Sequence, residues 1–271
     1  MLHGGTVGFD KQHFTTTSVD ELTDSVTFQY ISPDGDQGFP GTCTTTITYS
    51  LPPNSTDVKI TSCAAMSGSD CPVSIANHAY FNLAGHTAGR EKLRSHKIFL
   101  NADRYNPTNS TSIPTGIKSV DNTPFDFFSA GEGGRQIGEK IDFLKDLPGS
   151  GGGYDHNFCL CREGEGLQLA AVVTCEEEGI SLKVFTTAPG VQFYTGNYLG
   201  PSDPEVEGSA GPGLDQAVIE GKGGAKYERQ GALCLEAQEW PDAINNESFP
   251  CCVVKDGEER VHEMVYSIIE S

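Results

Sequence analysis

The sequence predicts an all-β protein built as a large antiparallel sandwich or barrel. Two observations support this fold class. Short runs rich in β-branched and aromatic residues recur along the chain, and 32 glycines and 15 prolines punctuate the gaps between them. Helical periodicity is hard to find, and its best short candidate, residues 135–144, carries Gly138 inside it. This pattern is typical of antiparallel sandwiches and barrels.

The expected strands follow one another along the whole chain. They cover residues 26–31, 42–49, 58–63, 73–75, 98–100, 167–174, 180–187, 191–194, 233–237 and 264–269. Residues 150–153 (SGGG) are typical of a flexible loop. Residues 200–224 are rich in glycine, proline and acidic residues, which is typical of a solvated insertion. We find no internal repeat and no other linker, so we expect a single domain over residues 1–271.

Length and charge bound the class of function. A chain of 271 residues and 29.0 kDa can bury a sizeable core. Its 18 basic and 37 acidic side chains give a formal charge of −19, which disfavours nucleic acid and anionic membrane as partners. We therefore expect a neutral or cationic partner. As a separate expectation, the protein is a monomer or homodimer.

The cysteines and the N-terminal residues predict the compartment. Nine scattered cysteines, an odd number without a CxxC pair, suit reduced thiols packed in a cytosolic protein better than a disulfide framework. The first residues, MLHGGTVGFD, have neither a basic region nor an apolar run typical of an export signal, and no run of about 18 apolar residues follows. We expect a cytoplasmic protein.

Four stretches set ionisable residues against aromatics and glycine. The first is PVSIANHAYFNLAG at 72–85, where we expect His78 at the point at which a strand passes into a loop. The others are HGG to GFD at 3–10, GYDHNF at 153–158 and LCLEAQ with WPD at 233–242. In a strand, Glu236 points to the face opposite Leu233, Leu235 and Ala237, and that face is either solvent or a functional site.

Several classes of site lack their motifs. The sequence contains no HExxH, CxxC or Cys₂His₂ pattern, and it contains neither a phosphate-binding glycine loop nor a GxSxG elbow. We expect no metal and no nucleotide cofactor. A histidine, a glutamate and an aspartate near aromatics remain, a set suited to acid–base chemistry on a neutral polyol.

The sequence resembles the galactose mutarotase (aldose 1-epimerase) family. The resemblance runs nearly end to end and is collinear: LHGG and GFDK at 2–11, ISPDG at 31–35, NHAYFNLAG at 77–85, YDHNF at 154–158, PGVQFYTGN at 189–197 and LCLEAQEWPDAINNESFP at 233–250. It implies a β-sandwich that binds one galactose or glucose and interconverts the α and β anomers. By position in the motifs, Glu236 would be the base and His78 the acid.

The same resemblance implies the residues that hold the sugar. They are His3 in LHGG, Ala79 and Tyr80 beside His78, Asp155 in YDHNF and Gln192 in PGVQF. Carboxylate and amide groups can each serve two hydroxyls, and an apolar ring such as Tyr80 or Trp240 can lie under the C–H face of a sugar. Asp155 could instead cap a turn, and His156 is expected to be a structural neighbour.

Three departures from the family pattern leave an alternative open. We expect the strands that precede LHGG in the family, with their Asn-Arg pair, to be absent here, either because an upstream portion of the protein is missing from this chain or because this is a shortened member of the family. Ala79 and Ala237 stand where hydroxyl residues are common, and residues 200–224 are longer and more acidic than usual. The alternative is a catalytically weak or inactive sugar-binding relative. An epimerase for phosphorylated hexoses is disfavoured, because no basic cluster accompanies the motifs.

Overall fold

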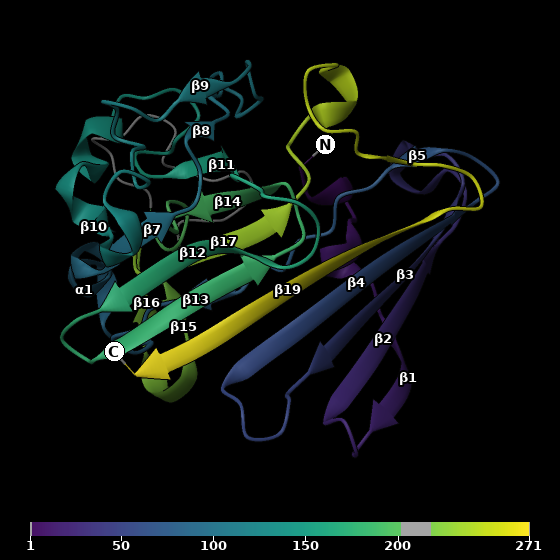
Figure 1. Cartoon of the computed structure of the whole chain (residues 1–271), viewed down its shortest axis with the longest axis horizontal. Helices are drawn as coiled ribbons and strands as arrows, with labels where there is room; N and C mark the ends of the chain where they lie inside the picture. Colours follow the sequence, from purple (N-terminus) through teal and green to yellow (C-terminus); the bar gives the residue numbers. More distant parts are fainter. Residues whose placement is uncertain (1, 202–217, 271) are drawn as a thin grey trace.

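The structure is a computed structural model that describes residues 2–201 and 218–270. It consists mainly of strands in two large sheets, and every strand pair in them is antiparallel. Figure 1 shows the larger sheet crossing the molecule, with β1 at one edge and β19 in the middle. The predicted all-β fold class is therefore confirmed. Most of the predicted insertion, residues 202–217, lies outside the described residues.

The larger sheet has nine strands. In spatial order these are β1 (Thr15–Asp20), β2 (Ser25–Ser32), β3 (Thr42–Ser50), β4 (Asp57–Ser67), β19 (Glu259–Glu270), β13 (Ile180–Thr186), β12 (Gln168–Cys175), β7 (Lys97–Leu100) and β10 (Arg135–Gln136).

The smaller sheet has six strands, and two short strand pairs accompany it. Its spatial order is β6 (Tyr80–Phe81), β17 (Leu233–Gln238), β14 (Gly190–Tyr194), β11 (Asp155–Cys159), β8 (Arg104–Tyr105) and β9 (Lys118–Ser119). The short pairs are β15 (Ile219–Glu220) with β16 (Lys226–Tyr227), and β18 (Val253–Val254) with β5 (Cys71–Pro72).

Helical structure in the described residues is brief. One α-helix, α1 (Gly89–Ser95), precedes β7. The 3₁₀ turns are η1 (Leu2–Gly4), η2 (Phe9–Lys11), η3 (Asp36–Gly38), η4 (Gly131–Gly133), η5 (Ile137–Glu139), η6 (Ile141–Leu144), η7 (Lys222–Gly224) and η8 (Ala243–Asn245). Residues 135–144, the best short candidate for a helix, instead form β10 followed by two 3₁₀ turns, η5 and η6.

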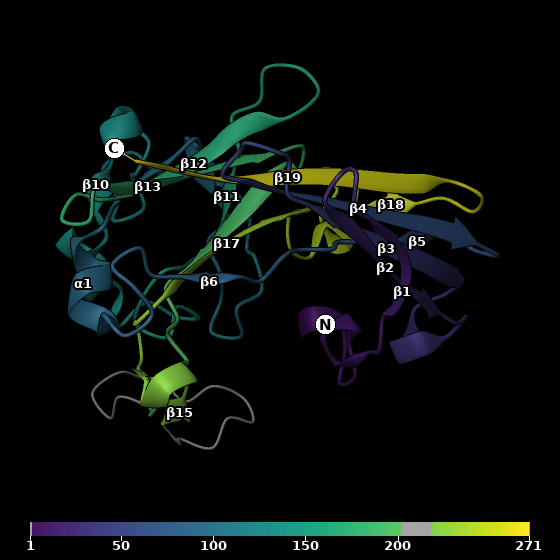
Figure 2. The ribbon, with the colours of Figure 1, turned by 90° about the horizontal axis from the view of Figure 1, so that it is seen from below.

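The main core lies between the two sheets. It combines Leu182, Val184 and Met264 of the larger sheet with Phe158 and Phe193 of the smaller one. Figure 2 shows this layering, with β19 and β4 above and β6 below them. The core holds β11, β14 and β17 rigidly, because their inward side chains are fully buried.

Most predicted strands are present, and one is wrong. Residues 73–75 form no strand, and His78 lies in the irregular stretch between β5 and β6. This stretch is held by side chains rather than by a strand ladder, since Asn77 accepts a hydrogen bond from the Ala79 amide and donates one to the Tyr49 hydroxyl. Strand periodicity cannot reveal a segment stabilised in this way.

Candidate active site

The candidate site lies on the face of the smaller sheet that points away from the core. In β17, Leu233, Leu235 and Ala237 belong to the core. Because side chains alternate along a strand, Glu236 projects from the opposite face, as the sequence predicted. That face is not open solvent at this point, because Glu236 is only 9% exposed.

Strand register gathers the polar side chains of this face into two rows. Glu236 of β17 lies opposite Gln192 of β14, which lies opposite Asn157 of β11. The neighbouring row consists of Tyr80, Cys234, Tyr194 and Asp155. Four strands that are far apart in sequence thus contribute to one patch, which we call the polar face.

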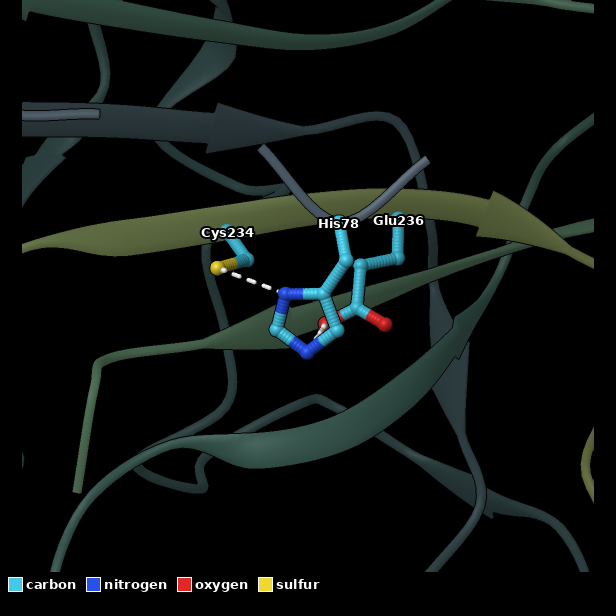
Figure 3. A group of neighbouring side chains, drawn as sticks. All are labelled: His78, Cys234 and Glu236. Carbon is cyan, nitrogen blue, oxygen red and sulfur yellow. Dashed lines mark hydrogen bonds and ion pairs between the residues drawn. The ribbon is translucent and has the colours of Figure 1, made fainter. Parts of the chain in front are cut away.

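His78 reaches over β17 and contacts two of its side chains. Figure 3 shows the imidazole between Cys234 and Glu236, with Nδ1 3.4 Å from the Cys234 sulfur and Nε2 3.6 Å from Glu236 Oε1. The side chain of His78 is 34% exposed and that of Glu236 is 12% exposed. The imidazole of His78 is therefore accessible to a ligand, whereas the carboxyl of Glu236 lies beneath it.

Three rings surround the imidazole of His78. Tyr80 stacks on it with 5.0 Å between ring centroids, and Tyr194 meets it edge-on at 6.2 Å. His3 approaches edge-on from the N-terminal segment at 5.7 Å. Tyr80 is 47% exposed, so an apolar ring face remains available beside the pair.

The N-terminal segment is folded back so that His3 reaches this place. The backbone around Gly8 passes so close to the His3 carbonyl that an added Cβ would lie 1.8 Å from its oxygen. The Val7 amide also donates a 3.1 Å hydrogen bond to the Gln37 side chain. Glycine at position 8 is thus required for the turn that brings His3 to His78.

A chain of amide hydrogen bonds fixes the other end of the polar face. Gln192 donates a 2.7 Å hydrogen bond to Asp155 Oδ1 and accepts one of 3.4 Å from Gln238. Gln238 also lies 3.4 Å from Asn157 Oδ1, and Asn157 donates to Asn106. The Asp155 carboxyl is therefore oriented by a network that leaves part of its hydrogen-bonding capacity for a ligand.

Burial perturbs the acid–base groups of the polar face. It raises the pKa of Glu236 to about 8, with a further contribution from the charge of Asp155. It raises the pKa of Asp155 to about 6 against the opposing hydrogen bond from Gln192. It lowers the pKa of His78 below the ordinary value, and the charge of His3 lowers it further. Burial favours the neutral forms of His78 and Glu236, whereas their approach to 3.6 Å favours the ion pair between them.

This balance suits proton transfer. A carboxylate that is costly to ionise is a stronger base once it is ionised, and an imidazolium with a lowered pKa is a stronger acid. When His78 and Glu236 together hold one proton, one of them can donate a proton to a bound ligand while the other accepts a proton from it. Perturbed ionisable groups that cluster in one place are characteristic of active sites.

The described residues that could ligate a metal ion are His78, Cys234 and Glu236, whose ligand atoms lie within 4.8 Å of one another. In this structure the imidazole uses Nδ1 toward the thiol and Nε2 toward the carboxylate (Figure 3). Burial and the neighbouring carboxyl groups also raise the pKa of the Cys234 thiol, whereas a metal ligand must be a thiolate. The imidazole thus directs one ring nitrogen toward the thiol and the other toward the carboxylate.

The structure brings together the residues proposed from the sequence. His3, His78, Tyr80, Asp155, Gln192 and Glu236 all lie on or beside the polar face. Ala79 follows His78, and its amide donates a hydrogen bond to Asn77 Oδ1. Asp155 is the first residue of β11, and its Oδ1 accepts a hydrogen bond from Gln192 of the neighbouring strand.

Other residues of the polar face were not proposed from the sequence. Cys234 and Gln238 share the phase of Glu236 in β17, and Tyr194 shares that of Gln192 in β14. The same period-two argument applied to every strand would have found them.

Two further residues singled out in the sequence lie elsewhere. His156 points into the core beside Phe125, at a ring distance of 4.6 Å. Trp240 packs on Phe249 and donates its indole N–H to the Pro189 carbonyl.

Comparison with known proteins agrees with the resemblance of the motifs. Residues 1–267 match the family model described as aldose 1-epimerase. The chain is 38% identical over 262 residues to galactose mutarotase of Mus musculus, with 96% of this chain and 67% of that protein covered. It is 37% identical, with the same coverage, to aldose 1-epimerase of Escherichia coli K12.

Solved structures show the same fold. A GalM/aldose epimerase homologue from C. elegans superposes with a TM-score of 0.80 at 24% identity, covering 99% of this chain and 72% of that one. Galactose 1-epimerase from Lactobacillus acidophilus NCFM gives 0.74 at 23% identity, covering 100% and 70%. The fold is therefore that of the galactose mutarotases.

Proposed function

The chain belongs to the aldose 1-epimerase family, which makes it an isomerase, and we propose that it interconverts the α and β anomers of galactose or glucose through proton transfers by Glu236 and His78. The observation that carries the proposal is the 3.6 Å approach of His78 Nε2 to Glu236 Oε1 on a half-open face lined by an exposed aromatic ring. A pyranose lying on that face presents its anomeric hydroxyl and its ring oxygen to one side, where both groups can reach them.

The reaction conserves protons. Glu236 as carboxylate takes the proton of the anomeric hydroxyl while His78 as imidazolium gives its proton to the ring oxygen, and the ring opens to the aldehyde. The aldehyde turns about the bond to the next carbon and presents its other face. His78 then recovers the proton as the ring closes, and Glu236 returns its own to the new anomeric oxygen. Each group contributes on the order of 10²–10⁴ in rate.

Sugar binding falls to the rest of the polar face. The oriented carboxyl of Asp155 and the amide of Gln192 offer acceptors and donors to neighbouring hydroxyls. The exposed ring of Tyr80 offers an apolar surface to the C–H face of the sugar, and the exposed imidazole of His3 offers a further hydrogen bond.

The test is polarimetry of freshly dissolved α-D-glucose and α-D-galactose. We expect the wild-type protein to accelerate the change in rotation well above the spontaneous rate, and Glu236→Gln and His78→Asn to lower kcat on the order of 10²-fold or more. His86→Asn is the matched control, because among the described residues the polar and ring contacts of His86 are with Tyr227 of the short hairpin, and this variant should keep the wild-type rate.

A wild-type rate equal to those of Glu236→Gln and His78→Asn would refute the enzymatic role. In that case a rise in melting temperature with sugar would identify a sugar-binding relative, because a ligand that binds the folded state stabilises it.

Compartment, assembly and domain organisation are also proposed. All nine cysteines are free, which supports a reducing, cytoplasmic location. Within residues 2–201 and 218–270, no helix combines the length and the apolar character that a bilayer crossing requires. A core that joins strands of both sheets supports one domain, and we expect a monomer or homodimer.

A further inference from the structure

The two residues of the proton-transfer pair are tied together by one tyrosine of the opposite sheet. Tyr266 of β19 is 5% exposed, and its hydroxyl lies 3.3 Å from Asn77 Oδ1 and 3.2 Å from the Leu235 carbonyl oxygen. Asn77 directly precedes His78, and Leu235 directly precedes Glu236. One hydroxyl therefore contacts the immediate neighbours of both residues from within the core.

The Tyr266 hydroxyl contacts β17 next to the point where the pairing of β17 with β6 ends. β6 pairs with β17 only through Phe81 with Leu233 and Tyr80 with Cys234. Beyond this point the chain that carries His78 leaves β17, so no ladder sets its distance from Glu236. The Tyr266 hydroxyl shares its one proton between two acceptors, Asn77 Oδ1 and the Leu235 carbonyl, and at the carbonyl it takes the place of a ladder hydrogen bond.

Asn77 is held on several sides. Its amide nitrogen donates to the Tyr49 hydroxyl of β3 at 3.1 Å, and its Oδ1 accepts from the Ala79 amide at 3.1 Å. Because Tyr49 and Tyr266 belong to the larger sheet, the segment carrying His78 is anchored to that sheet, whereas Glu236 is carried by the smaller one. The separation of the pair thus depends on a junction between the two layers.

We propose that Tyr266 is a positioning residue whose hydroxyl sets the His78 segment against β17, so that the imidazole and the Glu236 carboxyl flank the sugar at the productive distance. The ring of Tyr266 packs edge-on against Phe81 at 5.0 Å, which fixes the direction of the hydroxyl. A displacement of about 1 Å of a catalytic group can lower a rate on the order of 10²-fold, so a small relaxation of this junction is enough to affect kcat.

A purely structural role for Tyr266 makes a different prediction. Loss of the hydroxyl would leave the buried Leu235 carbonyl without its donor and would lower stability alone. Tyr154 provides the comparison, because it is fully buried in the same core and its hydroxyl donates a 3.1 Å hydrogen bond to the Pro124 carbonyl. Tyr154→Phe therefore removes a similar bond without contacting a neighbour of the pair.

The experiment compares Tyr266→Phe, Tyr154→Phe and Asn77→Ala with the wild type. We expect both tyrosine variants to lower the melting temperature, Tyr154→Phe by less because the Pro124 carbonyl also accepts from Arg135, but only Tyr266→Phe to lower kcat, by about tenfold or more and with KM little changed. Since Tyr266 acts through Asn77, the double variant Tyr266→Phe with Asn77→Ala should be no slower than Asn77→Ala alone. Equal kcat values for the two tyrosine variants, or independent and additive effects of Tyr266 and Asn77, would overturn the proposal.

The positioning role of Tyr266 rests on the proposed mutarotase function, and a second measurement tests the positioning role independently of that function. NMR titration of the His78 imidazole reports its surroundings without turnover, and we expect Tyr266→Phe, but not Tyr154→Phe, to change the titration midpoint of His78. An inactive wild type whose His78 responds in this way would refute the mutarotase function and retain the positioning. An active enzyme in which neither variant alters His78 or kcat would refute the positioning alone.

Discussion

Asp155 and Glu236 project from the same face of the smaller sheet, and the negative charge of Asp155 adds to burial in raising the pKa of Glu236 to about 8. The pKa of the base in the proposed reaction is therefore raised in part by a residue on another strand that we propose to bind the sugar. This coupling has consequences for both rate and stability.

The pH dependence of kcat/KM should be bell-shaped. The pair is competent when it holds one proton, because with two protons it lacks a base and with none it lacks an acid. With the pKa of His78 below the ordinary value of an imidazole and that of Glu236 raised to about 8, the rate should fall on the acid side as His78 and Glu236 both become protonated, and again above about pH 8. Polarimetry in buffers that do not themselves catalyse mutarotation measures this profile, and a rate that keeps rising above about pH 9 would contradict it.

Asp155→Asn should move the alkaline limb of that profile. Removal of the charge leaves burial as the remaining cause of the raised pKa of Glu236, so the limb should shift to lower pH. KM should rise as well, because the substitution alters a group proposed to hold hydroxyls. Asp121→Asn, at an exposed position, is the control and should change neither quantity. An unshifted limb in Asp155→Asn would show that this charge does not act on Glu236.

Glu236→Gln should stabilise the protein at alkaline pH while lowering its activity. The folded-state pKa lies above the value of 4.5 for the free side chain, so the folded protein retains a proton that the unfolded chain has lost. The contribution of this group to the free energy of unfolding therefore decreases as pH rises from about 4.5 to about 8. We expect a melting temperature a few degrees above wild type at about pH 9, since roughly 1 kcal/mol corresponds to about 2–4 °C in a chain of this size.

A second buried glutamate gives the opposite expectation. Glu239 is paired with Arg260 at 3.0 Å and with His262 at 2.9 Å, so Glu239→Gln removes favourable pairing and should lower the melting temperature. Thermal melts of both variants at about pH 5 and about pH 9 make the comparison. Destabilisation of Glu236→Gln at the higher pH would mean that the ionised carboxylate is well solvated in the folded state.

Gly153→Ala should destabilise the entry to β11. An added Cβ would lie 2.1 Å from Asn197 Oδ1 and 2.7 Å from Thr195 Oγ1. Asn197 cannot yield easily, because it is fully buried and donates to the Ser150 and Tyr154 carbonyls. We expect a loss of about 1–3 kcal/mol in the free energy of unfolding, measured by denaturant titration. Gly133→Ala, with no atom within 4 Å of the added carbon, should be nearly neutral.

Local sequence pattern predicted the strands that hold the site but not the segment that holds His78. Residues 191–194 and 233–237 alternate clearly and form β14 and β17. β11 was not predicted, because the run from Asp155 to Cys159 mixes polar and apolar residues, and both faces of it are largely buried. The stretch before β6 reads as a strand but is stabilised by the side chain of Asn77. Side-chain bonds to distant tyrosines leave no periodic signal.

The sequence by itself determined the all-β class, the family and the face on which Glu236 lies, because alternation and collinear motifs are properties of the chain alone. Only the tertiary structure decided that Glu236, Gln192 and Asn157 stand in one row, that Cys234 contacts His78 and that Tyr266 joins the two layers. The physical reason is that strand register and the packing of one sheet on another bring together residues from distant parts of the chain. The distance between His78 and Glu236, and the pKa values that depend on burial, arise from that packing.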